Sequence, residues 1–213
     1  MGRLQESRSE ETRRAILSAA GRLFAQKGFD AVSIREIAKE AGCSHTTLYI
    51  YFKDKEALLH ELSVGPLEGL HQQLREVLDD KSLAPREKAK RLGSRFVQFC
   101  LEHRTMYSLF FTTKAERVDC PEPAVPLNRL RNQLFGMLRE SLLACLPPDL
   151  KEETGLAYAR IYFYTLHGIV GTYNQSEEPL EQLLERLTPT FELTVEVLLD
   201  GFIQNEKRRS EKQ

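Results

Sequence analysis

Apolar residues recur at helical spacing along nearly the whole chain. From Glu10 to Lys27 they fall three and four residues apart, at Ile16, Ala19, Ala20, Leu23 and Phe24. No stretch shows the sustained apolar/polar alternation between hairpin turns that is typical of strands. The pattern predicts an all-α fold, with a first helix that stops at Gly28, where a glycine tolerates the left-handed conformation.

Two short helices separated by a tight turn are predicted next. Ser33 and Glu36 have the spacing of a capping box, in which a hydroxyl and a carboxylate satisfy the free amides of a helix start. This helix breaks at residues 41–43, where a glycine allows a sharp turn. Ser44 then caps a second helix from His45 to Phe52. Two short helices at a sharp angle form a helix-turn-helix.

The second of these helices presents a polar face. Leu48 and Phe52 are four residues apart and are predicted to point inward, which leaves a row of other side chains outside: His45, Thr46, Thr47, Tyr49 and Ile50. Hydroxyl, imidazole and phenol groups exchange hydrogen bonds with base edges and phosphates. The face therefore suits the major groove of DNA, although two such helices also occur as an ordinary helical corner.

The stretch from Ser33 to Leu58 resembles the DNA-binding signature of the TetR family of bacterial transcriptional repressors. It combines an I-A-x-x-A-G-x-S turn, a T-L-Y-x-Y-F recognition helix and a K-x-K-E-x-L opening of the next helix, at uninterrupted spacing. The similarity extends from Glu10 to Leu59, roughly a quarter of the chain. Beyond Leu59 only the helical plan and the length agree with the family.

The resemblance implies DNA contacts residue by residue. Ser33 would contact phosphate, Tyr51 and Lys55 would hold phosphates, and four recognition-helix residues would approach bases or backbone: His45, Thr46, Thr47 and Tyr49. His45 stands where many members carry a lysine, a glutamine or a small residue. Tyr51 has the alternative of packing its ring on the following helix.

The chain is predicted to divide into a three-helix DNA-binding domain, residues 1–54, and a larger helical domain, residues 55–213, for effector binding and dimerisation. Asp54 caps the helix that connects them. Gly65-Pro66 should kink or interrupt this helix, because proline removes a backbone amide.

The last two helical segments, about residues 152–174 and 180–203, are the longest and most apolar. In the TetR family such helices pair with their copies in a second subunit, which implies a homodimer. Gly168 and Gly171 would allow close approach there. The alternative is that their apolar surface belongs wholly to the core of one chain.

The resemblance also implies a small-molecule pocket between the middle helices. Ten candidates for its lining are aromatic, sulfur-containing or imidazole side chains: Phe96, Phe99, Cys100, Met106, Tyr107, Phe110, Met137, Tyr162, Phe163 and His167. They suggest a largely apolar or aromatic effector. Such side chains at helical spacing also form ordinary core, and His167 has the alternative of a hydrogen-bonded core histidine.

Charge is nearly balanced, with 30 basic and 31 acidic residues. Residues 1–60 hold ten basic and eight acidic residues, a net charge of +2, and the remainder carries −3. A general polycationic surface is excluded. Four arginines near the start either add phosphate contacts or form a solvated face: Arg3, Arg8, Arg13 and Arg14.

Several other classes of protein are disfavoured. There is no apolar run long enough to span a membrane and no apolar stretch between Met1 and Glu11, so a cytoplasmic protein without membrane contact is expected. Four scattered cysteines contain no C-x-x-C pair, which favours reduced thiols and no metal. Catalytic motifs are missing: His60-Glu61 has Val64 where a zinc protease needs a second histidine.

Together these features predict a ligand-responsive repressor rather than an enzyme. It would need no cofactor, bind palindromic double-stranded operator DNA as a homodimer, and be released by its effector. A helical sensor that does not bind DNA is the alternative.

Overall fold

The structure, a computed structural model, describes residues 2–211, with residues 2–7 described by their backbone alone. Within this range every regular element is a helix, which confirms the predicted all-α class. The elements are α1 Gly2–Lys27, α2 Ile34–Glu40, α3 His45–Tyr51, α4 Lys55–Asp79, α5 Pro85–Glu102, the 3₁₀ turn η1 Arg104–Met106, α6 Tyr107–Phe111, α7 Pro126–Leu143, α8 Glu152–Tyr173 and α9 Leu180–Ser210. None of the helices in the described part of the chain is long and apolar enough to cross a bilayer.

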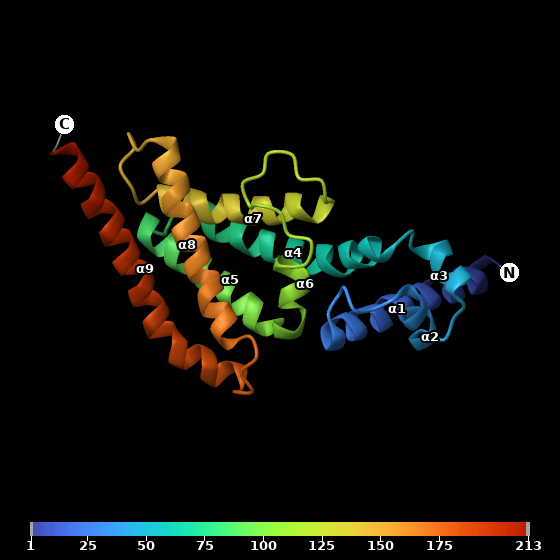
Figure 1. The fold of residues 1–213 in the computed structure, drawn as a ribbon. Helices are drawn as coiled ribbons and strands as arrows, with labels where there is room; N and C mark the ends of the chain where they lie inside the picture. Colours follow the sequence, from blue (N-terminus) through green and yellow to red (C-terminus); the bar gives the residue numbers. More distant parts are fainter. Residues whose placement is uncertain (1, 212–213) are drawn as a thin grey trace.

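The helices form two groups joined by α4 (Figure 1). α1, α2 and α3 lie together at one end of the molecule, and α5 to α9 form a bundle at the other. α4 starts beside α1 and continues into the bundle, where it packs against α5 and α7. Five leucines of α4 are buried along its length: Leu58, Leu59, Leu67, Leu70 and Leu74.

Hydrogen bonds of the capping serines fix the starts of the two short helices α2 and α3, as predicted. The Ser33 hydroxyl accepts a hydrogen bond from the Glu36 amide at 3.2 Å, and the Ser33 amide donates to the Glu36 carboxylate at 2.9 Å. The bond from the Ser33 amide is the largest of the effects that lower the pKa of Glu36 to about 2. Gly42 takes a positive φ of 70° in the turn, and the Ser44 hydroxyl accepts from the Thr47 amide at 3.0 Å to start α3.

Two helix limits differ from the prediction at the N-terminal end. α1 begins at Gly2, not Glu10, because Leu4 is the one large apolar residue among residues 2–9, which therefore carry no apolar stripe that would reveal a helix. α3 ends at Tyr51, and Phe52 follows as an extended cap whose amide still bonds to the Leu48 carbonyl. Gly28 ends α1 with a φ of 82°, as predicted.

Of the two predicted effects of Gly65-Pro66, the interruption is wrong, because α4 runs through Pro66 as one helix, whereas a kink there stays a prediction. A proline removes one backbone hydrogen bond and crowds the carbonyl four residues earlier. Here Ser63 and Leu67, on either side of the proline, are both buried, so tertiary packing holds the two halves of α4 in one helix.

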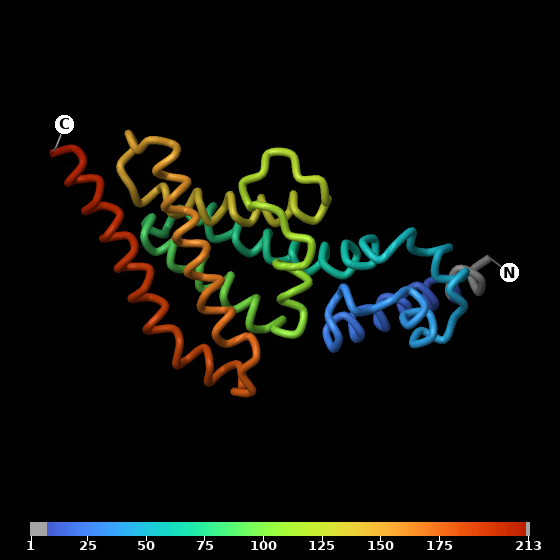
Figure 2. Tube along the Cα trace, in the orientation of Figure 1, coloured from blue at the N-terminus to red at the C-terminus, as the bar shows by residue number. Residues whose placement is uncertain are grey.

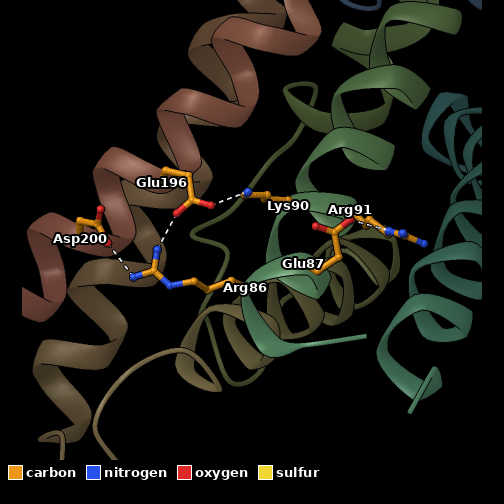
Figure 3. Close-up of polar contacts among 6 residues, drawn as sticks. All are labelled: Arg86, Glu87, Lys90, Arg91, Glu196 and Asp200. Carbon is orange, nitrogen blue, oxygen red and sulfur yellow. Dashed lines mark hydrogen bonds and ion pairs between the residues drawn. The ribbon is translucent and has the colours of Figure 1, made fainter. Parts of the chain in front are cut away.

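A network of ion pairs joins α9 to α5 (Figure 3). Arg86 lies between two carboxylates of α9, with Glu196 at 2.5 Å and Asp200 at 2.6 Å. Lys90, one turn along α5, pairs with Glu196 as well. Exposed pairs contribute little free energy one by one, but a network on successive turns sets the register of the two helices.

A close contact between α5 and α8 lies deeper in the bundle. Tyr162 is fully buried, and its hydroxyl donates to the Ala89 carbonyl at 2.6 Å. This hydroxyl lies over Gly93: a Cβ added there would be 2.3 Å from it and 2.9 Å from the ring of Phe191. The absence of a side chain at Gly93 is therefore required by packing.

We expect two glycine-to-alanine substitutions to have opposite effects. Gly93→Ala should lower the free energy of unfolding by about 2 kcal/mol or more, because the new methyl displaces the buried Tyr162 hydroxyl from its acceptor. Gly136→Ala, on the exposed side of α7 with no atom within 4 Å of the added Cβ, should raise it by about 0.5–1 kcal/mol. Urea unfolding followed by circular dichroism measures both, and an equal change in the two variants would contradict the packing argument.

Candidate nucleic-acid interface and ligand cavity

α3 carries an exposed face. Leu48 is buried and Phe52 packs inward, as predicted, whereas His45 and Thr46 are exposed. Tyr49 is 51% exposed, and its ring meets the His45 ring edge-on with centroids 6.1 Å apart. Ile50, at 76% exposure, extends the same surface. The face therefore offers an imidazole, a hydroxyl, a phenol and an apolar group to a partner.

Two other predicted contact residues take part in helix caps. The Ser33 hydroxyl donates to the Glu36 carboxylate at 2.8 Å, and the Thr47 hydroxyl lies 2.8 Å from that of Ser44. Both residues stand at the starts of helices, beside free backbone amides that favour anions. Their contact with phosphate remains a prediction.

Tyr51 and Lys55 have structural partners that the sequence did not reveal. The Tyr51 hydroxyl donates to the Ser9 hydroxyl of α1 at 3.2 Å. The Lys55 ammonium donates to the carbonyls of Phe29 at 2.7 Å and Val32 at 2.8 Å, and it lies 4.5 Å from the centre of the Phe29 ring. Lys55 thus ties the start of α4 to the loop before α2, and a phosphate contact would compete with these bonds.

Other cations near α3 are more available. Arg35 and Lys39 of α2, and Lys53 before α4, are exposed and form no ion pair within the described chain. Sequence reasoning missed them, although cations flanking a recognition helix are the expected signal. Of the arginine cluster predicted near the start, two members are paired: Arg13 with Glu61 at 2.5 Å and Arg14 with Glu10 at 3.6 Å. Arg8 is exposed, and the side chain of Arg3 lies outside the described residues.

A cavity of about 140 Å³ lies between α5, α6, α7 and α8. Aromatic and aliphatic side chains dominate its walls, with three polar ones among them: Phe96, Phe111, Ala115, Glu116, Val118, Arg131, Leu134, Phe163 and His167. Phe96, Phe163 and His167 belong to the predicted lining. The other seven predicted residues do not line this cavity: Phe99, Cys100, Met106, Tyr107, Phe110, Met137 and Tyr162.

The guanidinium of Arg131, in one wall, is buried and uses four of its five N–H groups in hydrogen bonds to the protein. It donates to the carbonyls of Phe110 at 2.6 Å, Leu109 at 2.9 Å and Thr113 at 3.0 Å, and to the Asn128 amide oxygen at 2.7 Å. Burial lowers the pKa of Arg131 to about 10, which leaves it protonated at neutral pH. It therefore fixes the end of α6 against α7.

Glu116 is the opposite charge in the same cavity. Its carboxylate accepts from the Val125 amide at 3.1 Å and from the Asn128 side chain at 2.8 Å. Asn128 thus connects Glu116 to Arg131, and the bond from Val125 is the largest of the effects that lower the pKa of Glu116. These bonds hold the segment 112–125, which arches from α6 to α7 (Figure 2).

His167 lies among aromatic rings. Its ring centroid is 4.2 Å from that of Phe163, 5.2 Å from Phe96 and 5.6 Å from Phe111. Nδ1 is 2.6 Å from the Tyr107 hydroxyl, whereas Nε2 is buried with no hydrogen-bond partner in the described part of the chain. Burial lowers the pKa of His167 to about 4, so the imidazole is neutral at pH 7.

α8 and α9 expose an uncharged face away from the rest of the bundle. Its large apolar side chains are about half exposed or more: Ile161 43%, Tyr164 59%, Leu193 63% and Val197 62%. A groove of about 510 Å³ runs beside them, lined without any charged residue by Thr165, Gly168, Ile169, Thr172, Tyr173, Leu187, Thr190, Phe191 and Thr194. A Cβ added at Gly168 or Gly171 would meet no atom within 4 Å, so packing inside the chain does not require these glycines.

Comparison with protein families distinguishes among the functions that this geometry allows. Residues 16–62 match the bacterial regulatory proteins of the tetR family, and residues 89–198 match the tetracyclin repressor-like C-terminal domain. The chain belongs to the TetR family. This confirms the predicted family, whose members are helix-turn-helix transcriptional regulators and not enzymes.

Individual relatives are similar in sequence to this TetR-family regulator over part of its length. The HTH-type transcriptional regulator YerO of Bacillus subtilis (strain 168) is 37% identical over 129 residues, 59% of this chain and 40% of YerO. The HTH-type transcriptional repressor KstR2 of Mycolicibacterium smegmatis is 30% identical over 117 residues, 54% of this chain and 56% of KstR2. The chain spans less than half the length of the first curated relatives that it matches.

Solved structures share the fold of this TetR-family regulator. The regulator FadR of Bacillus subtilis, in complex with stearoyl-CoA, superposes with a TM-score of 0.64 at 20% identity, over 88% of this chain and 98% of FadR. At that identity the similarity concerns the fold alone.

We expect the buried imidazole to make this regulator less stable in mild acid. Above pH 6.5 His167 is neutral in both the folded and the unfolded chain. Below pH 6.5 the unfolded chain binds a proton at His167, whereas the folded chain does not bind one until the pH falls to about 4. The free energy of unfolding should therefore fall between pH 6.5 and pH 4, by up to about 3 kcal/mol from this group. Urea unfolding across that range measures the slope, which should flatten in His167→Phe. A wild-type slope in the variant would contradict the assignment.

Proposed function

We propose that this TetR-family regulator is a repressor that binds palindromic operator DNA as a homodimer and is released by a small, largely apolar or aromatic effector. Residues 1–54 bind DNA, and residues 55–213 bind the effector and the second subunit. The relative KstR2, at 30% identity over 117 residues, is named a transcriptional repressor, which supports this direction of regulation.

The exposed face of α3 is the observation that carries the proposal. His45, Thr46 and Tyr49 are exposed on one short helix, where the rings of His45 and Tyr49 meet edge-on. A helix of this kind enters the major groove, where imidazole, hydroxyl and phenol groups meet base edges. Ser33, Thr47, Tyr51 and Lys55 lie around it and position or contact the phosphates. The unpaired cations of this region add phosphate contacts: Arg35, Lys39 and Lys53.

The uncharged face of α8 and α9 supports a homodimer. Interfaces are depleted of charge at their centres and enriched in aromatic and apolar side chains, which describes Tyr164, Leu193 and Val197. A face that pairs with its own copy generates twofold symmetry. Two recognition helices then read two half-sites about 34–36 Å apart, so the operator is a palindrome.

The ligand cavity is connected to the DNA-binding helices through its own walls. α6 supplies Phe111 to the cavity and contacts α4, while the adjoining turn η1 contacts α1. The segment 112–125 lines the cavity with Glu116 and also brings Lys114 to within 3.8 Å of Glu56, in the first turn of α4. An effector that moves these walls moves α4, and the two recognition helices then no longer fit adjacent grooves. A differential affinity of about 1–3 kcal/mol between the two states is enough for such a switch.

Selection from a random duplex library tests the whole proposal. The purified full chain is incubated with the library, and the retained duplexes are sequenced. We expect a palindrome with half-sites one helical turn apart to be enriched. Failure of the folded protein, after extraction of any bound small molecule, to enrich any sequence would overturn the proposal.

We expect Tyr49→Ala to lower operator affinity without affecting the fold. Tyr49 is half exposed on α3, so its loss removes a DNA contact worth about 1–3 kcal/mol, roughly a tenfold to hundredfold change in Kd. Fluorescence anisotropy with the selected duplex measures the affinity. Gln133→Ala, an exposed change on α7, is the control and should bind like the wild type. Wild-type affinity in Tyr49→Ala would remove the residue from the interface.

We expect Leu193→Asp to separate the subunits. Placing a carboxylate at a 63% exposed position costs the single chain little, but in the proposed dimer it buries an unpaired charge in both subunits. Sedimentation equilibrium should show a monomer with wild-type helix content, whereas Gln133→Asp should remain dimeric. A dimer of undiminished affinity in Leu193→Asp would place the interface elsewhere.

A further inference from the structure

The chemistry of the cavity identifies the class of molecule that it binds. We infer that it takes an uncharged molecule built on one aromatic ring and carrying one hydrogen-bond acceptor, such as a carbonyl oxygen, which accepts from Nε2 of His167. The inference rests on the proposed function, in which an effector occupies this cavity, and adds the size, charge and polar group of that effector.

The volume of the cavity sets the size of the ligand. An apolar cavity of about 150 Å³ accepts one benzene molecule. The present cavity, at about 140 Å³, therefore accommodates one ring, and a small substituent has room only where the cavity borders solvent at the exposed Ala115. The rings of Phe96, Phe111 and Phe163 supply walls against which an aromatic ring packs edge-on or offset.

The hydrogen bonds of His167 identify the polar group that the ligand carries. The 2.6 Å contact between Tyr107 and Nδ1 is shorter than the usual N–H···O distance of about 2.9 Å and fits a hydroxyl donor. If Nδ1 donated instead, both the buried Tyr107 hydroxyl hydrogen and the Nε2 lone pair would lack partners. Tyr107 therefore donates to Nδ1, and the ring hydrogen is on Nε2. Nε2 is then a buried donor that lacks an acceptor among the described residues. Because almost none of its surface is accessible, a ligand carbonyl reaches it only when a neighbouring side chain of the cavity wall moves aside.

The charges in the walls exclude an ionic ligand. Arg131 and Glu116 are opposite in sign, and Asn128 bridges them with bonds of 2.7 Å and 2.8 Å. The guanidinium donates four hydrogen bonds to oxygen atoms of the protein. The cavity thus has no net charge, so a carboxylate would be buried without a counter-charge, and an ammonium would face the Nε2 hydrogen.

Four small probes of one ring test the inference by isothermal titration calorimetry on the full chain. Acetophenone carries the acceptor, ethylbenzene has nearly the same shape without it, and benzoate and benzylamine add a charge. We expect acetophenone to bind about tenfold more tightly than ethylbenzene, the value of one hydrogen bond to a buried donor, and the two ions to bind more weakly still.

Two variants and one spectroscopic measurement locate the contact. His167→Phe should remove the preference for acetophenone over ethylbenzene, whereas His103→Phe, at a histidine outside the cavity lining, should keep it. Nitrogen-15 spectra of histidine-labelled wild-type protein provide a reading that needs no variant. They should show the Nε2–H tautomer for His167 and a shift of its Nε2 signal when acetophenone is added.

Several results would overturn the inference: equal binding of ethylbenzene and acetophenone, tightest binding of benzoate or benzylamine, no binding of any one-ring probe, or an Nδ1–H tautomer. Operator release, measured in parallel, separates this inference from the proposed function. Release by a long-chain acyl-CoA with no binding of the one-ring probes would leave the proposed function intact and reject the ligand class. Binding of acetophenone with the expected preference, but without any release, would reject the switch and leave the site assigned.

Discussion

The packing of α4 against both groups of helices is the constraint on which the rest of the structure depends. Its 25 residues form one helix with buried leucines along its length, and this helix contacts α1 as well as α5 and α7. Lys55, in the first turn of α4, donates hydrogen bonds from its ammonium to the carbonyls of Phe29 and Val32. Because a continuous helix transmits displacement along its axis, the orientation of α1 to α3 follows from how α4 sits in the bundle.

The end of α6 shows how a buried charge organises a site. Arg131 donates to the backbone carbonyls of Leu109 and Phe110 in this short helix and of Thr113 just after it. Asn128 bonds both Arg131 and Glu116. Lys114, in the same segment, has a positive φ of 51°, a conformation that residues other than glycine adopt only when their surroundings impose it. One wall of the cavity is thus fixed by hydrogen bonds, and the opposite wall is packed aromatic rings.

Much of the architecture is readable from local sequence. Helix periodicity gives the all-α class, and caps such as Ser33 with Glu36 act within four residues, so a linear pattern determines them. The inward direction of Leu48 and Phe52 follows from their spacing alone. The same reasoning fails where a helix lacks a stripe, as in the first turns of α1, and where distant packing overrides a local breaker, as at Pro66.

The sequence by itself determined the class of fold, the helix-turn-helix and the exposed face of α3, because each rests on neighbours within one or two turns. Only the tertiary structure decided which of the buried aromatic residues border a cavity: Phe96 and Phe163 do, whereas Phe99 and Tyr162 do not. It also decided that Lys55 binds carbonyls of a loop more than twenty residues away and that His167 keeps an unpartnered nitrogen. Periodicity tells which side of a helix is apolar, but which helix covers that side, and how closely, depends on packing between residues far apart in the chain.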